Sequence, residues 1–224
     1  MTVLRRIRRL FANRSGVAMT EFALGAPLLL TAGLWGVETA NFAVTNMKIG
    51  QLAVHLADNG SRIGDTSTLQ DRKIYEADIN DLLIGANIQG GNQLDLYEHG
   101  RVMISSLEVE SASGDQYIHW QRCRGKKHVT SGYGNEGEVI SGIGPSGEEI
   151  SAEPGDAVIF VEISYDYQPL VSSRFLTGNN TISTVAAFTV RDDRDLTQIY
   201  QRDPGSPDEI SSCAAYTGAP DINS

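Results

Sequence analysis

The sequence predicts an α+β fold, in which a long N-terminal helix leads into a second helix and an antiparallel sheet of about four strands. Three observations support this prediction. An apolar run near the N-terminus continues into a segment whose apolar residues recur at helical spacing. A second stretch with helical periodicity follows it. After residue 100 the pattern changes to partly alternating apolar and polar residues, bounded by glycine-rich turns, which is typical of strands.

Composition and charge exclude several classes of protein. Of the 224 residues, 41% are hydrophobic, so the chain can bury a core and is not disordered as a whole. The net charge of −10 argues against a nucleic-acid-binding protein, which needs a basic face. The charge is uneven, because the first 14 residues hold no acidic residue and five arginines: Arg5, Arg6, Arg8, Arg9 and Arg14. Basic flanks of this kind stay in the cytoplasm when an apolar segment follows them.

The apolar segment runs from Phe22 to Val37 without a charge and ends at Glu38. As a helix it spans about 24 Å, and including residues 17–20 extends it to about 31 Å but encloses Glu21. A cleaved secretory signal, a permanent anchor and a buried core helix are the three interpretations. The arginines and the continuous apolarity argue against a core helix, and the helical pattern beyond residue 40 argues against a cleaved signal. We therefore predict an anchor that is uncleaved or trimmed only on its cytoplasmic side.

The first helix is expected from about Ala18 to Arg62, because its apolar positions keep a spacing near 3.6. The apolar positions that recur at this spacing beyond the apolar run are Phe42, Met47, Ile49, Leu52, Ala53, Leu56 and Ile63. A second helix is expected over Leu69–Ile84. Ser67 and Gln70 fit a capping box at its start, and Gly85, followed by Gly90-Gly91-Asn92, is expected to end it.

Four strands are expected after the helices, at residues 101–110, 115–123, 157–167 and 181–190. Residues 125–155 form a glycine-rich insert, which we expect to be a mobile surface loop. The insert has two G-x-G-x-x-G matches, but neither the preceding strand nor the following helix of a dinucleotide site is evident. The polar tail, residues 192–224, is expected to be solvated and to pack loosely on the sheet.

Few residues are suited to chemistry. Cys123 and Cys213 are the only cysteines, and an even pair favours one disulfide if the head lies outside the cytoplasm; the alternative is two unrelated buried thiols. His119 and Cys123 would lie about 13 Å apart on a strand, too far for a catalytic hydrogen bond. The sequence shows no metal-binding spacing and no catalytic motif. We therefore expect no metal, no cofactor and no enzymatic activity.

The junction between the basic N-terminal segment and the apolar helix resembles that of a known protein family. Gly16 follows the arginines, Glu21 stands five residues later beside Phe22, and Pro27 interrupts the apolar run. This pattern resembles the class III signal of type IV pilins, and most closely the TadE-like minor pilins of the Tad (tight adherence) pilus. The resemblance implies that a prepilin peptidase cleaves after Gly16, so that Val17 becomes the first residue and Glu21 the fifth. It also implies that Glu21 pairs with the α-amino group of a neighbouring subunit.

The resemblance further implies a leader at residues 1–16, a transmembrane helix at 17–38 and a pilin-like extracytoplasmic head at 39–224. Such a minor pilin or pseudopilin would act in pilus initiation, assembly or tip formation, through contacts with other Tad pilus subunits and the inner-membrane assembly platform. It would cross the bacterial inner membrane once, with its N-terminus in the cytoplasm and its head in the periplasm or outside the cell. The alternatives are a membrane-anchored periplasmic binding domain unrelated to pili and, as a third class, an anchored hydrolase.

Overall fold

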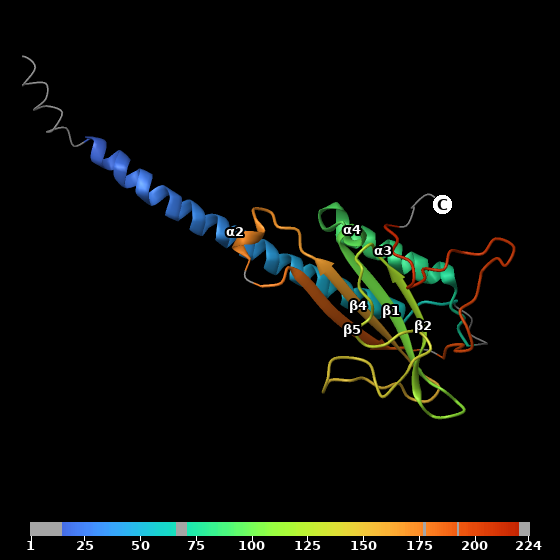
Figure 1. The fold of residues 1–224 in the computed structure, drawn as a ribbon. Helices are drawn as coiled ribbons and strands as arrows, with labels where there is room; N and C mark the ends of the chain where they lie inside the picture. Colours follow the sequence, from blue (N-terminus) through green and yellow to red (C-terminus); the bar gives the residue numbers. More distant parts are fainter. Residues whose placement is uncertain (1–14, 66–70, 177, 192, 220–224) are drawn as a thin grey trace, which may run out of the picture. The chain divides into compact units, whose positions relative to one another are not determined.

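The protein is an α+β protein, as the sequence predicts, in a computed structural model that describes residues 15–65, 71–176, 178–191 and 193–219 (Figure 1). The described chain divides into two compact units, residues 1–43 with 169–179 and residues 44–168 with 180–224. The elements in chain order are α2 (Ser15–Gly60), α3 (Glu76–Leu94), α4 (Leu96–His99), β1 (Gly100–Val109), β2 (Gln116–Arg124), β3 (Val139–Ile140), β4 (Ala157–Asp166), the 3-10 helix η1 (Ser173–Phe175) and β5 (Thr181–Thr189).

Helix α2 is 46 residues long and continues through Pro27, within a few residues of the predicted bounds. Its C-terminal half has one buried stripe at spacings of three and four residues, which is the pattern of a helix that packs by one face. The stripe consists of Ile49, Leu52, Ala53, Leu56 and Ala57. Met47, which is one of the apolar positions that indicated the helix, is not part of the stripe, because its side chain is 64% exposed. Met47 lies two residues before the stripe begins, and such a step rotates a side chain to another face of the helix.

Helix α3 begins and ends later than predicted, at Glu76 and Leu94 rather than at residues 69 and 84. The expected capping pair, Ser67 and Gln70, lies outside the described residues. The observed start is closed by the Asp78 carboxylate, which accepts the Tyr75 backbone N–H at 3.1 Å. The backbone leaves the helical conformation at Gly91, whose φ is +67°, within the predicted stop at Gly90-Gly91-Asn92. Gly85 does not end the helix, and the buried residues Ala86 and Leu94 follow it. Their burial outweighs the roughly 1 kcal/mol that a glycine costs inside a helix.

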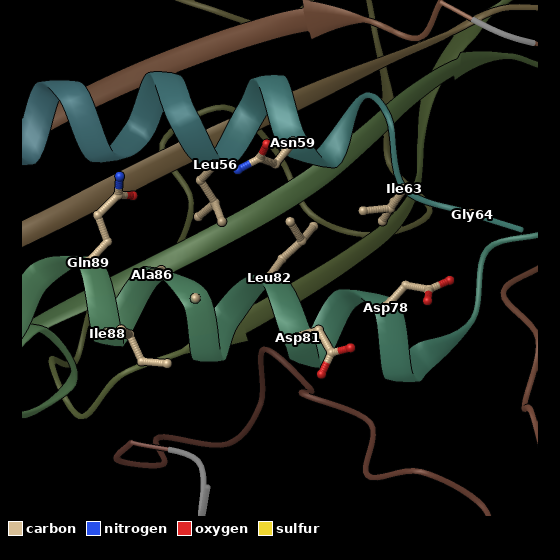
Figure 2. Close-up of a pocket in the computed structure, with 11 residues that line it drawn as sticks. Leu56, Asn59, Ile63, Gly64, Asp78, Asp81, Leu82, Ala86, Ile88 and Gln89 are labelled. Atoms are coloured by element: carbon tan, nitrogen blue, oxygen red, sulfur yellow. The ribbon is translucent and has the colours of Figure 1, made fainter. Parts of the chain in front are cut away.

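The sheet is antiparallel throughout, with the strand order β3-β2-β1-β4-β5. The four predicted strands are confirmed to within one residue at each end. The two-residue strand β3 was not predicted. The end of α2 lies against β4, where a Cβ added to Gly60 would come within 3.0 Å of Ile159 Cγ2. This part of α2 and α3 lie side by side over the same face of the sheet (Figure 2).

The glycine-rich insert lies over the opposite face of the sheet, and although most of its residues are exposed, as expected for a surface loop, a few of them are buried against the strands. Ile143 and Ala152 of the insert are buried in one apolar cluster with Phe160 and its neighbours on the strands. The Tyr133 ring meets the Phe160 ring edge-on, with 5.2 Å between centroids. Glu162 of β4 is buried beneath the insert, where it accepts hydrogen bonds from the Ser131 hydroxyl and, at 3.1 Å, from the Gly132 N–H. Both faces of the sheet are therefore covered.

A bulge in β2 produces a buried polar contact. The pairing of β1 with β2 shifts register between Ser106 and Leu107, and this leaves His119 outside the register. The His119 Nδ1 lies 2.7 Å from Glu108 Oε2, and the Ser106 hydroxyl donates to the other oxygen of that carboxylate at 2.7 Å. The hydrogen bond to Glu108 raises the pKa of His119, and partial burial opposes this rise.

The raised pKa of His119 predicts a pH-dependent contribution to stability. A histidine whose pKa is higher in the folded chain contributes stability that is complete below its unfolded pKa, about 6.5, and is lost as the pH rises through the folded value. The difference in free energy of unfolding between the wild type and His119→Gln should therefore be larger at about pH 5.5 than at about pH 8.5. Urea titrations of the full chain in detergent measure this difference. A difference that is constant across this range would contradict the assignment.

Candidate functional site

The N-terminal half of α2 exposes a long apolar surface. Ten of its large apolar side chains are exposed: Val17, Met19, Phe22, Leu24, Leu28, Leu29, Leu30, Leu34, Trp35 and Val37. Within the described part of the chain, Gly16–Gly60 is the one helix long and apolar enough to cross a membrane, with a mean hydropathy of 1.5 in its most apolar window. Soluble monomers rarely expose a continuous apolar surface of this size. Lipid or other apolar helices are the surroundings that suit it.

The hydroxyl groups on this half of the helix are satisfied locally. Three threonine side chains donate to backbone carbonyls of α2 itself: Thr20 to Val17 at 2.8 Å, Thr31 to Pro27 at 2.7 Å and Thr39 to Trp35 at 2.9 Å. A polar group in hydrocarbon is costly unless it has a hydrogen-bond partner. These threonines therefore do not disqualify the segment from a lipid environment.

The predicted leader junction lies at the start of α2. Gly16 and Val17 are in its first turn, and Val17 is 51% exposed. Glu21 is exposed and Phe22 beside it is 70% exposed. Within the described residues, the structure records no hydrogen bond or ion pair for the Glu21 carboxylate. The five arginines lie outside the described residues, and cleavage after Gly16 and assembly through Glu21 stay predictions.

Glu38, at the other end of the apolar run, is a site residue that the sequence analysis missed. Its side chain is fully buried and accepts three backbone N–H groups, from Leu170 at 3.3 Å, Val171 at 2.6 Å and Ser172 at 3.2 Å. Residues 169–179, which connect β4 to β5, belong to the same compact unit as this part of α2. The sequence separation of more than 130 residues between Glu38 and its donors means that no local pattern could have indicated the contact.

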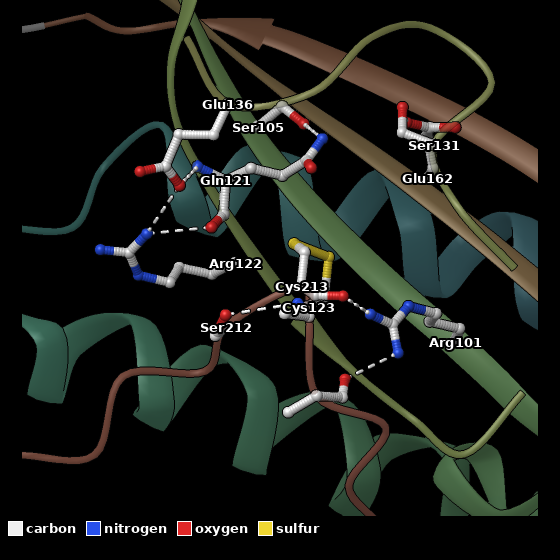
Figure 3. The surroundings of a disulfide bond; sticks show 12 residues. Arg101, Ser105, Gln121, Arg122, Cys123, Ser131, Glu136, Glu162, Ser212 and Cys213 are labelled. Carbon is white, nitrogen blue, oxygen red and sulfur yellow. Dashed lines mark hydrogen bonds and ion pairs between the residues drawn. A yellow bond between two sulfur atoms is a disulfide. The ribbon is translucent and has the colours of Figure 1, made fainter. Parts of the chain in front are cut away.

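The predicted disulfide is confirmed, since Cys123 in β2 is bonded to Cys213 in the tail, with 4.7 Å between the Cα atoms (Figure 3). The side chain of Arg101, which is only 1% exposed, holds the same part of the tail. Its Nη2 donates to the Cys213 carbonyl at 2.6 Å and its Nη1 to the Ala215 carbonyl at 3.0 Å. The Arg101 guanidinium also lies over the Tyr216 ring, 4.1 Å from the centroid. The expectation of a loosely packed tail is therefore wrong for residues 211–216.

A second buried arginine connects the sheet to α3. The Arg122 side chain forms an ion pair with Glu76 at 2.5 Å and a longer one with Glu136 at 3.3 Å, the latter drawn in Figure 3. Glu76 is the first residue of α3, where a carboxylate also complements the helix dipole. The sequence analysis singled out neither Arg101 nor Arg122. For Arg101 a signal was available, because the apolar residues Val102, Met103 and Ile104 follow it in a strand, and a buried charge needs a partner.

Two hollows on the larger unit have volumes above 500 Å³ in the described part of the chain. The first, here called the α2–α3 groove, has a volume of about 580 Å³, with Leu56, Leu82 and Ala86 along it and Asp78 and Asp81 toward one end (Figure 2). The second, of about 510 Å³, lies over the sheet beside Glu162.

Among the described residues, no group of three His, Cys, Asp or Glu side chains could hold a metal ion. The Sγ atom of Cys123 is bonded in the disulfide, so it is not a free nucleophile beside His119.

In comparisons with family models, curated proteins and solved structures, nothing matches this chain. Its function is therefore inferred from the residues and their geometry.

Loss of the disulfide should destabilise the head strongly. The bond closes a loop with a sequence separation of 90, which in the chain-entropy estimate contributes about 4–5 kcal/mol. We expect Cys123→Ala/Cys213→Ala to lower the free energy of unfolding by up to about that amount in urea titrations of the full chain in detergent. Ser212→Ala, which keeps the bond, is the matched control and should unfold near the wild-type midpoint. An unchanged midpoint in the double variant would show that the bond contributes nothing.

Proposed function

We propose that this chain is a minor pilin or pseudopilin of the Tad type, processed by a prepilin peptidase after Gly16. The apolar half of α2 anchors it in the bacterial inner membrane, with the N-terminus in the cytoplasm and the head in the periplasm or outside the cell. It acts in pilus initiation, assembly or tip formation through protein–protein contacts and catalyses no reaction. The observation that supports this most is the position of Glu21, a carboxylate without a recorded partner on an exposed apolar helix, five residues after Gly16.

The chemistry of Glu21 is consistent with docking. A carboxylate inside a membrane costs up to about 3 kcal/mol at the bilayer centre and less near the interface. Removal of residues 1–16 would create a positively charged α-amino group on Val17 and would discard all five N-terminal arginines. Pairing of Glu21 with this amine on a neighbouring subunit neutralises both charges where water is scarce. One such pair per contact also fixes the axial register of the two helices.

The exposed side chains of α2 suit the partners that this proposal implies. Helices in a membrane associate through close packing, because lipid tails give no hydrophobic driving force between them. The ten exposed apolar side chains offer such packing surface to lipid before assembly and to helices of other Tad pilus subunits after it. The remaining implied partners are the inner-membrane assembly platform and the prepilin peptidase.

A membrane-anchored periplasmic binding domain unrelated to pili is the second candidate. The α2–α3 groove favours it, because about 580 Å³ is within the usual range of ligand pockets. This candidate leaves the five-residue spacing between Gly16 and Glu21 without a purpose.

The N-terminus of the mature protein separates the two candidates. We expect mass spectrometry of the protein extracted from membranes of its native host to show a chain that starts at Val17. An intact Met1, or a cut near Ala40, would remove the pilin proposal and leave an anchored or secreted domain.

Substitution of Glu21 tests the docking role directly. We expect Glu21→Ala to insert in the membrane normally and to be lost from purified pili. If the pair contributes about 1.4 kcal/mol or more, incorporation falls about tenfold or more. Thr20→Ala is the matched control, since the Thr20 hydroxyl bonds only within its own helix at 2.8 Å. Normal incorporation of Glu21→Ala would contradict the role.

A further inference from the structure

We propose that residues 169–179, here called the β4–β5 loop, form an interfacial membrane anchor that Glu38 holds against α2. In this proposal Leu170 and Val171 enter the lipid surface on the head side of the bilayer, and Arg174 contacts lipid phosphates. The proposal rests on the part of the proposed function in which α2 spans a membrane. It does not depend on leader cleavage or on pilus assembly.

The position of Glu38 along α2 places the loop at a membrane boundary. Glu38 follows Glu21 by 17 residues with no charge between them, which corresponds to about 26 Å of helix. The hydrocarbon core of a bilayer is about 30 Å thick. With Glu21 near one interface, Glu38 lies near the other. The loop that it binds then lies where hydrocarbon gives way to headgroups.

Most backbone N–H groups of the loop's described residues have hydrogen-bond acceptors, which suits a position at the lipid surface. Three N–H groups donate to Glu38, and three more donate within the loop: Arg174 to the Ser172 hydroxyl at 3.3 Å, Phe175 to the Ser172 carbonyl at 3.1 Å and Leu176 to the Ser173 carbonyl at 3.1 Å. Pro169 has no N–H to satisfy. Unpaired peptide groups are the main cost of bringing a loop toward lipid. Glu38 removes that cost for the N–H groups of Leu170 and Val171, the two residues whose side chains would enter the lipid surface.

The side chains of the loop have the character of an interfacial anchor. Leu170 is 68% exposed and Val171 is 37% exposed, although both backbones are fixed on a buried carboxylate. Phe175 and Leu176 are half-buried, and Arg174 between them and the apolar pair is exposed. Within the described residues, the structure records no ion pair for the Arg174 guanidinium. Apolar residues beside a cation are typical of segments that lie in the headgroup region.

Lipid is the occupant that these observations favour over a second copy of the chain. The exposed pair is bound through its backbone at Glu38, the residue after Val37, where the exposed apolar surface of α2 ends, and that surface is the one that faces lipid in the proposed function. An arginine without an acidic partner complements anionic lipid phosphates.

A photo-crosslinking amino acid at position 170 tests the proposal. The full chain is placed in nanodiscs of phosphatidylethanolamine and phosphatidylglycerol, irradiated and analysed by intact mass. Position 29 in the apolar helix is the positive control, and position 210, whose native isoleucine is 53% exposed in the tail, is the negative control. We expect lipid adducts at 170 and at 29 and none at 210.

Each other outcome has a distinct meaning. Adducts at 29 without adducts at 170 overturn the interfacial anchor and leave the membrane span intact. No adducts at 29 overturn the membrane span and the anchor together. Cross-links from 170 to a second copy of the chain, in place of lipid, overturn lipid as the occupant.

The role of Glu38 is tested in the same assay. We expect Glu38→Ala to reduce the lipid adducts at 170 to the level seen at 210 and to leave those at 29 unchanged. The matched control is Thr39→Ala, the neighbouring exposed residue, whose hydroxyl bonds only to the Trp35 carbonyl of its own helix. Adducts at 170 that persist in Glu38→Ala would show that the loop does not depend on this carboxylate.

Discussion

Helix α2 presents two different surfaces along its length, and the contacts made by the rest of the chain depend on this difference. From Val17 to Val37 its large side chains are exposed and apolar. From Ile49 to Ala57 one stripe is buried and the other faces carry exposed polar residues such as Gln51 and His55. Because an α-helix satisfies its own backbone hydrogen bonds, it can pass from one environment to the other without a break. One helix can therefore pack against the head with its C-terminal half and present an apolar surface with its N-terminal half.

The two faces of the sheet are covered by segments with very different sequence patterns. Helices α2 and α3 give one cover by ordinary helical periodicity, whereas the other comes from an insert with little regular structure. The insert begins at Gly125, where its backbone passes close to the backbone of β1. Its φ is +128°, and a Cβ there would come within 2.2 Å of the Gly100 carbonyl oxygen. Any other residue would collide with the backbone of β1, so the second cover requires glycine at this point.

Local pattern accounts for what the sequence predicted, and distant partners account for what it missed. Alternation defined β4, and the buried stripe of α2 followed from its spacing, because both depend on neighbours within a few residues. The predicted glycine stop lies at the observed kink at Gly91, but the continuation of α3 past Gly85 depends on buried core contacts, which no local rule contains. The same holds for the Arg101 bonds to the tail and for the three donors to Glu38. The predicted leader junction differs, since the prediction comes from a short local motif alone, and the structure adds only that Val17, Glu21 and Phe22 are exposed.

The two carboxylates that bound the apolar run differ in one respect that matters for function. Glu38 is fully buried and both its oxygens accept N–H groups of the same chain, so it is not exposed to a neighbouring subunit. Glu21 is exposed and has no recorded partner in the described residues. A carboxylate that a membrane segment retains without an internal partner needs one from outside. If α2 spans a bilayer, the intramolecular contact belongs to Glu38 and the intermolecular one to Glu21.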